Sequence, residues 1–303
     1  MTDASPLAGQ AAIVTGAGSG LGRAYALTLG ALGASVVAND LETAEQAVTS
    51  VCRAITDGGG SAAAALASVA DADSGDRIVR AALDAFGRLD IVVANAGVLR
   101  SAMFPEIDDD SWRLHQSVHA DAAFYLTRAA WPVMLSRHYG RIVLTTSSAG
   151  LFGAHGLSGY AASKMAVVGL LRVLATEAAG TGIRVNAVAP FASTPMSRGG
   201  GRTGSTAQIL GDAFDGFNPE QVSAVVAALS HPDCPAQGQV LAAGGGRVAE
   251  ILIAETTGFR SASLTWHEVL GRWDEIRSRD DIVVPATLRD ELRLYARAAH
   301  TPE

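Results

Sequence analysis

Short runs of β-branched and other apolar residues alternate with longer amphipathic stretches over residues 11–189. This alternation is typical of repeated β-α-β units, in which the connecting helices bury a parallel sheet on both faces. It predicts an α/β fold, namely a doubly wound (Rossmann), mostly parallel sheet with helices on both faces. Seven strands are expected, at residues 11–15, 35–39, 61–67, 90–95, 141–146, 184–189 and 239–243.

The domain organisation follows from where this pattern ends. Asn218-Pro219 suits the start of a helix before the last strand, because Pro is favoured at the first helical position. Beyond the last strand the pattern loosens into helical fragments, too short a stretch for an independent core. We expect a dinucleotide-binding domain at residues 1–249, including a glycine-rich substrate lid at 191–217, and a helical C-terminal extension at 250–303.

Composition excludes several classes of protein. The formal net charge is −7 and no cluster of basic residues is present, whereas nucleic-acid-binding proteins concentrate Lys and Arg on one face. Neither a secretion signal nor an apolar stretch of membrane-spanning length is evident, so we expect a cytoplasmic protein with no membrane partner. Cys52 and Cys234 lack the spacing of a metal site or a disulfide framework, and no metal is expected.

A glycine-rich turn, Thr15-Gly-Ala-Gly-Ser-Gly-Leu-Gly22, lies between the first predicted strand and a helical stretch. Glycines there allow the backbone to approach a pyrophosphate, whose charge is met by N–H groups at the start of the helix. The turn alone is weak evidence, but the strand before it and the helix after it make it a dinucleotide-binding fingerprint. The expected cofactor contacts in this segment are Gly16, Ser19, Gly20, Leu21 and Gly22.

The second predicted strand ends in Asn39-Asp40, 18 residues beyond Gly22. A carboxylate at this place accepts hydrogen bonds from the adenosine ribose hydroxyls and repels a 2′-phosphate. Asp40 therefore favours NAD over NADP, and we include Leu41 with it in the cofactor site. An NADP-dependent ketoreductase is the alternative that Asp40 disfavours.

The fourth predicted strand leads into Asn95-Ala96-Gly97. Small residues here leave room for a cofactor, and Asn95 is expected to hold the adjacent strand and loop together. Taken alone, the tripeptide indicates only a turn.

Ser147, Tyr160 and Lys164 form the candidate catalytic group. In a helix beginning near Tyr160, Lys164 lies one turn later on the same face, where its ammonium group is expected to lower the pKa of the phenol. Lys164 is the only lysine of the chain, although Lys and Arg together number 23. An ammonium can serve both the phenol and a ribose hydroxyl, which a broad guanidinium does less readily. Ser147 is placed to hold the substrate oxygen.

These motifs together resemble those of the short-chain dehydrogenase/reductase family over residues 7–248. The resemblance implies that Tyr160 is the general acid and base, that Ser147 orients the carbonyl, and that Lys164 binds ribose and tunes Tyr160. It also implies that the nicotinamide carboxamide is bound by Thr194, four residues after Pro190. The matching segments are Thr15 to Gly22, Asn95 to Gly97, Ser147, Tyr160 with Lys164, and Arg184-Val-Asn186 through Pro190.

Three positions depart from the family pattern. His119 stands where the family usually has Asn, whose main-chain carbonyl positions a water of the proton relay, so we include His119 among the catalytic candidates. Ser68 replaces the acidic residue usual after the third strand, with Asp71 displaced, which implies a different contact with adenine. Phe191 stands where Gly often follows the Pro, and is expected to narrow the nicotinamide side of the pocket.

A narrower resemblance rests on four segments: Thr15 to Leu27, Val37 to Leu41, Val118-His119 and Thr127 to Trp131. These segments resemble the branch of the family that contains the (3R)-hydroxyacyl-CoA dehydrogenase portion of peroxisomal multifunctional enzyme type 2. That branch shares a His at the position of His119, oxidises 3-hydroxyacyl-CoA with NAD, and has relatives that act on steroids. The resemblance implies an NAD-dependent enzyme that interconverts a secondary alcohol and a ketone. It leaves open whether the substrate is a 3-hydroxyacyl-CoA or a steroid-like compound. The guanidinium groups of Arg198 and Arg202 suit the binding of a CoA phosphate. The sequence is equally consistent with a solvated loop in which both side chains contact nothing.

Two further expectations concern partners and turnover. The family commonly forms homo-oligomers through helices corresponding to residues 109–137 and 160–179, which implies a dimer or tetramer. A non-catalytic NAD-binding sensor on the same scaffold is the alternative function. It has no need of Ser147, Tyr160 and Lys164 together, so their presence favours the enzyme.

Overall fold

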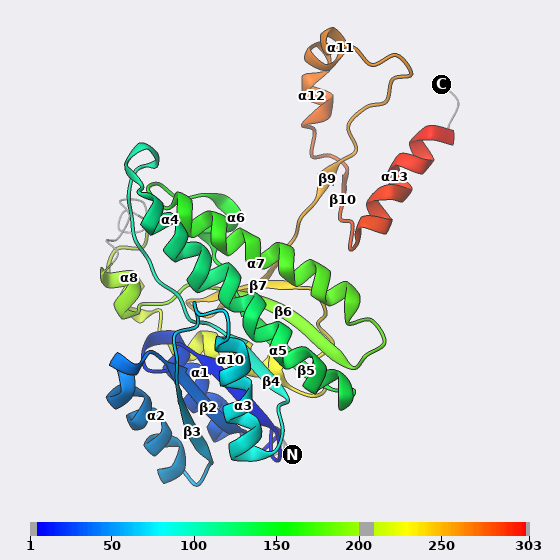
Figure 1. The fold of residues 1–303 in the computed structure, drawn as a ribbon. Helices are drawn as coiled ribbons and strands as arrows, with labels where there is room; N and C mark the ends of the chain where they lie inside the picture. Colours follow the sequence, from blue (N-terminus) through cyan, green and yellow to red (C-terminus); the bar gives the residue numbers. More distant parts are fainter. Residues whose placement is uncertain (1–4, 200–208, 301–303) are drawn as a thin grey trace. The chain divides into compact units, whose positions relative to one another are not determined.

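An eight-stranded sheet organises the computed structural model, which describes residues 5–199 and 209–300. The strand order is β3-β2-β1-β4-β5-β6-β7-β8, and every contact from β3 to β7 is parallel. The doubly wound α/β fold is therefore as predicted (Figure 1). The strands are β1 (Ala11–Thr15), β2 (Ser35–Asp40), β3 (Ala62–Leu66), β4 (Ile91–Ala94), β5 (Gly140–Thr145), β6 (Ile183–Pro190), β7 (Val240–Gly244) and β8 (Arg247–Ile251).

Helices cover both faces of this sheet. On one face α1 packs against α2 and α10, and on the other α3 packs against α5 while α7 packs against η3. Apolar side chains between these layers are fully buried, Ile13, Val93 and Val143 among them. The helices are α1 (Gly20–Ala31), α2 (Glu45–Asp57), α3 (Ser74–Phe86), α4 (Asp109–His115), η3 (Gln116–Asp121), α5 (Ala122–Ser136), α6 (Ser148–Phe152), α7 (Ser158–Glu177), α8 (Pro195–Gly199) and α10 (Pro219–Ser230), with short 3-10 turns at η1 (Glu42–Ala44), η2 (Phe104–Glu106) and η4 (Gly211–Gly216).

The strand order reverses between β1 and β4. Strands β1 to β3 extend the sheet in one direction, and β4 to β7 extend it in the other. In an open parallel sheet, the crevice at such a reversal lies beyond the carboxyl ends of the strands and is where ligands bind. A ligand site is therefore expected among the residues that follow β1, β2, β4, β5 and β6.

Two elements of the first 250 residues differ from the sequence-based expectation. The sheet has an eighth strand, because Gly245 and Gly246 both have positive φ and form a two-residue turn that allows β8 to pair with β7. The helix expected at residues 109–137 contains a π-helical segment, η3, between α4 and α5. Hydrophobic periodicity does not distinguish a π-helical turn from the α-helix on either side of it.

The chain divides into two compact units, Met1–Glu250 and Ile251–Glu303. The second unit contains the helices α11 (Trp266–Gly271), α12 (Trp273–Ile276) and α13 (Leu288–His300). It also has an antiparallel pair that the sequence did not predict, β9 (Glu255–Thr256) with β10 (Ile282–Val283). Among the described residues, no helix combines the length and apolarity needed to cross a membrane.

Candidate active site

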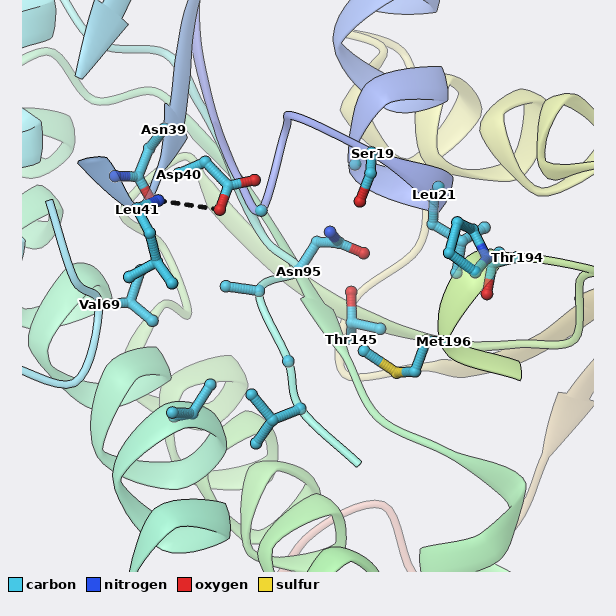
Figure 2. Close-up of a pocket in the computed structure, with 18 of the residues that line it drawn as sticks. Ser19, Leu21, Asn39, Asp40, Leu41, Val69, Asn95, Thr145, Thr194 and Met196 are labelled. Atoms are coloured by element: carbon cyan, nitrogen blue, oxygen red, sulfur yellow. Dashed lines mark hydrogen bonds between the residues drawn. The ribbon is translucent and has the colours of Figure 1, made fainter. Parts of the chain in front are cut away.

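A pocket of about 260 Å³ lies at the carboxyl ends of the central strands. Asp40 and Leu41 are at one end of it and Thr194 at the other, with Asn95 between them (Figure 2). The structure brings every predicted cofactor contact to this pocket: Gly16, Ser19, Gly20, Leu21, Gly22, Asp40, Leu41, Asn95, Ala96, Gly97, Tyr160, Lys164, Pro190 and Thr194.

The glycine-rich turn forms a cradle for an anion. Gly16 has a φ of 66°, and a Cβ atom on Gly22 would collide with the carbonyl oxygen of Gly16. The first turn of α1 has no acidic residue, and the side chain of its N-cap, Ser19, makes no capping hydrogen bond. The positive end of the helix dipole is therefore not neutralised by an acidic residue of the helix itself, and backbone N–H groups at such a helix start suit a phosphate.

Asp40 holds its carboxylate at the end of β2. One oxygen accepts a hydrogen bond from the backbone N of Gly18 at 2.9 Å, and the other accepts from the backbone N of Leu41 at 2.8 Å. These two bonds fix the carboxylate against the glycine-rich turn. Each carboxylate oxygen accepts more than one hydrogen bond, so both retain capacity for ribose hydroxyls.

Asn95 ties the loop after β4 to β1, as the sequence predicted. Its side-chain amide donates to the carbonyl oxygen of Thr15 at 2.9 Å. In return, the hydroxyl of Thr15 accepts from the backbone N of Asn95 at 2.9 Å and of Ala96 at 3.0 Å. The wall of the pocket formed by this loop is thus anchored to the central strand of the sheet.

The part of the pocket next to the end of β3, where the family resemblance implies adenine, has no carboxylate from the residues that follow that strand. Ser68 lines the pocket there, whereas Asp71 does not and instead pairs with Arg77 at 2.7 Å. The displaced Asp71 is therefore engaged elsewhere, and the residues available to an adenine ring are Ser68 and Val69.

Tyr160 and Ser147 meet at the catalytic end. Tyr160 lies in the first turn of α7, and burial raises the pKa of its phenol, while a hydrogen bond with Ser147 acts in the opposite direction. Ser147 follows β5 and caps α6, accepting from the backbone N of Ala149 at 3.1 Å. It is not one of the residues that line the pocket.

Lys164 lies one turn after Tyr160 and is 4% exposed. Its Nζ donates to the carbonyl oxygen of Thr145 at 2.9 Å, and burial lowers its pKa to about 7. The expectation that Lys164 lowers the pKa of Tyr160 is wrong for this structure, in which that pKa is raised. The reason is that burial removes water from the phenol, and the charge of Lys164 is not among the causes that shift the pKa of Tyr160.

His119 is buried beside these residues. Its Nδ1 lies 2.8 Å from the hydroxyl of Ser163, and its Nε2 accepts from the backbone N of Val98 at 3.0 Å. Burial is the main cause that lowers the pKa of His119 far below its ordinary value, and the nearby charge of Lys164 adds to it. His119 does not line the pocket of about 260 Å³, so the structure does not place it against a cofactor.

Of the segment expected to form a lid, residues 191–217, the structure describes 191–199 and 209–217. The ring of Phe191 packs edge-on against Phe214 and Phe217, with centroids at 5.2 and 5.6 Å. Phe191 does not line the pocket, so the expected narrowing of the nicotinamide side is wrong. The side chain of Arg198 and all of Arg202 lie outside the described residues.

Several lining residues were not predicted. Thr145 follows from the fold, because it is the last residue of β5, a parallel strand next to β4, whereas Asn39 carries no sequence signal of its own. The hydroxyl of Thr145 and the side-chain carbonyl of Asn39 are buried without a hydrogen-bond partner within the described residues. The other unpredicted lining residues are Ala67, Val69, Val98, Val118, Thr146, Pro195 and Met196.

This arrangement fits a dinucleotide. The cradle suits a pyrophosphate, Asp40 has free hydrogen-bonding capacity for a ribose, and the orphan hydroxyl of Thr145 belongs to the same pocket lining as Lys164. Fold and site together define an α/β protein with a pocket at the carboxyl ends of a doubly wound sheet, lined by the phenol of Tyr160 and the amine of Lys164.

Comparisons with known proteins identify the family. The family model for short chain dehydrogenases matches residues 10–201. Peroxisomal multifunctional enzyme type 2 of Mus musculus is 35% identical over 300 residues, which are 95% of this chain and 39% of that protein. The chain belongs to the short-chain dehydrogenase family of oxidoreductases.

Solved structures agree with this assignment. The full-length peroxisomal multifunctional enzyme type 2 from Drosophila melanogaster matches with a TM-score of 0.79 and 28% identity, over 96% of this chain and 49% of that one. A short chain dehydrogenase from Mycobacterium avium matches with a TM-score of 0.77 and 30% identity, over 90% and 97%. The chain therefore spans less than half the length of these two multifunctional enzymes, from Mus musculus and Drosophila melanogaster.

Proposed function

We propose that this protein is an NAD-dependent dehydrogenase that interconverts a secondary alcohol and a ketone, with a 3-hydroxyacyl thioester as its substrate class. The observation that carries the proposal is the meeting of Tyr160 and Lys164 with Asp40 and the glycine cradle in one pocket. A protein that only bound the dinucleotide would have no use for an acid–base group at this end.

Each catalytic side chain has a role that follows from its chemistry. The nicotinamide, when bound, supplies the hydride acceptor or donor. Tyr160 takes the proton of the alcohol during oxidation and returns it to the oxygen during reduction. Ser147, hydrogen-bonded to Tyr160, orients the substrate oxygen, and Lys164 holds the ribose beside the phenol.

Asp40 supports NAD as the cofactor. Its carboxylate is held by the backbone N–H groups of Gly18 and Leu41, so it cannot swing away from an incoming 2′-phosphate without losing both bonds. The repulsion between two anions disfavours NADP. Titration of the protein with each cofactor tests this: we expect NAD to bind at least about tenfold more tightly, and tighter binding of NADP would overturn the assignment.

The 3-hydroxyacyl class is supported by the resemblance to the branch described above and by the 35% identity to the mouse multifunctional enzyme. A spectrophotometric screen for NADH formation should compare 3-hydroxyacyl-CoA, steroid alcohols and simple secondary alcohols. We expect turnover with the acyl thioester. Tight binding of NAD with no turnover of any alcohol would instead favour the sensor alternative.

A further inference from the structure

Two histidines on consecutive helical segments hold the loop that follows β4. Nε2 of His119 accepts a hydrogen bond from the backbone N of Val98 at 3.0 Å, and Nε2 of His115 accepts from the backbone N of Arg100 at 3.1 Å. The two rings stack with centroids 5.8 Å apart, and their residues are 3% and 0% exposed. The loop is therefore fastened by imidazoles at alternate residues.

The direction of these bonds determines the protonation of the rings. A backbone N–H can only donate, so Nε2 of both rings carries no proton. A neutral His119 must then carry its proton on Nδ1, which donates to the hydroxyl of Ser163 at 2.8 Å. That hydroxyl donates to the carbonyl oxygen of Tyr160, also at 2.8 Å. One chain of hydrogen bonds thus runs from Val98 through His119 to the backbone of Tyr160.

We propose that His119, assisted by His115, is a positioning residue that clamps the 96–98 wall of the pocket to the helix of Tyr160 and acts only as a neutral imidazole. The inference rests on the dehydrogenase function proposed above. Ala96, Gly97 and Val98 all line the pocket, so the clamp sets the distance between this wall and the phenol. His119 itself is not one of the residues that line this pocket.

The surroundings of His119 keep it neutral. The titratable groups that face its ring are Tyr160 and Lys164 from α7 and His115 from α4. Burial, and after it the charge of Lys164, lowers the pKa of His119, so the ring does not gain a proton in the physiological range. Protonation would also place an N–H on Nε2 against the N–H of Val98, which would break the clamp.

Substitutions of His119 by Gln and by Asn test its two hydrogen bonds one at a time, the bond to the backbone N of Val98 and the bond to the hydroxyl of Ser163. The amide of Gln reaches about as far as Nε2 and can accept from Val98, whereas the shorter amide of Asn reaches about as far as Nδ1 and can contact only Ser163. We expect His119→Gln to keep kcat within about threefold. We expect His119→Asn to lower kcat by about 10- to 100-fold, the scale of a small misplacement at a reacting centre. The affinity for NAD should change less than kcat in both variants.

A pH profile separates positioning from proton transfer. If His119 acts only as a neutral imidazole, His119→Asn lowers kcat by the same factor at every pH between about 5 and 9. The shape of the pH profile of kcat then stays unchanged. Loss of a limb of the profile in either variant would overturn the proposal, because it would identify His119 as a titrating group of the reaction. Full activity of His119→Asn, or rescue by Asn and not by Gln, would overturn it as well.

Amide hydrogen exchange supplies a readout that needs no substrate. We expect residues 96–100 to exchange faster in His119→Asn than in His119→Gln, and equal exchange in the two variants would contradict the clamp even if the proposed substrate were wrong. His138→Asn is the matched control: His138 is exposed and has a φ of 51°, a conformation that Asn tolerates. It should leave exchange in this loop and turnover unchanged.

Discussion

Tyr160 is a buried phenol whose pKa is raised, because burial disfavours the phenolate and holds the side chain in its neutral, proton-carrying form. Burial rather than a neighbouring charge dominates its titration. The hydrogen bond with Ser147 acts against that effect and connects the two residues that are proposed to hold the substrate oxygen.

Replacing Tyr160 by Phe removes the proton donor while keeping the ring. We expect NAD to bind as before and turnover to fall by at least about 10²-fold, the contribution of a positioned general acid and base. Cofactor titration and initial rates measure the two effects. Tyr125→Phe, on α5, serves as the control, and near-normal turnover of Tyr160→Phe would exclude the phenol from the reaction.

Lys164 is expected to lower the stability of the cofactor-free protein. Its folded-state pKa of about 7 lies below its ordinary value, so between about pH 7 and 10 the unfolded chain binds more protons than the folded one. Stability from this residue therefore rises with pH across that window, and the penalty is fully present below it.

The variant Lys164→Met removes this penalty. We expect it to melt several degrees above the parent protein at pH 7, with the difference shrinking toward pH 10, and to lose turnover. Thermal unfolding at several pH values checks the trend. A variant that melts lower at pH 7 would show that the bond from Lys164 to the Thr145 carbonyl outweighs the desolvation of the ammonium group. Lys164→Arg should also lose activity, because the buried site accommodates a single ammonium.

At the scale of elements, the turn between β1 and α1 depends on the absence of a side chain. Substituting Gly22 by Ala puts a methyl group into the carbonyl oxygen of Gly16 and into the side chain of Asn95. We expect the turn to shift, NAD affinity to fall at least tenfold and the protein to lose stability. Calorimetric titration and thermal unfolding measure both effects.

Gly169→Ala is the matched control for that substitution. Gly169 lies inside α7, and a Cβ atom there meets nothing within 4 Å. Because Ala is favoured over Gly in a helix by about 1 kcal/mol, this variant should be slightly more stable and bind NAD normally. Normal binding by Gly22→Ala would mean that the cradle is not the pyrophosphate site.

At the scale of the whole molecule, α5 and α7 carry exposed apolar side chains. Phe124 and Leu135 on α5 are 42% and 40% exposed, and Met165 and Val173 on α7 are 39% and 55% exposed. Monomeric proteins tolerate single exposed apolar residues, but such residues on both helices favour an interface between copies.

We expect the 31.0 kDa chain to sediment as a dimer or tetramer. Val173→Glu should shift the distribution toward smaller species, because a carboxylate at an interface loses its hydration. Analytical ultracentrifugation measures this, with Met103→Glu, an exposed loop position, as the control. A parent protein that sediments as a monomer would contradict the expected assembly.

The strands β1 to β7, the doubly wound fold, and the residues of the glycine turn, Asp40 and Asn95 followed from sequence, because their signals are local: periodicity, glycine spacing and position at the end of a strand. The roles of His119 and Phe191 and the pKa of Tyr160 needed three-dimensional packing. Each depends on partners far along the chain, such as Val98 with His119 or Phe214 and Phe217 with Phe191. Burial, hydrogen-bond direction and dielectric environment arise only when those segments meet, and no local pattern encodes them.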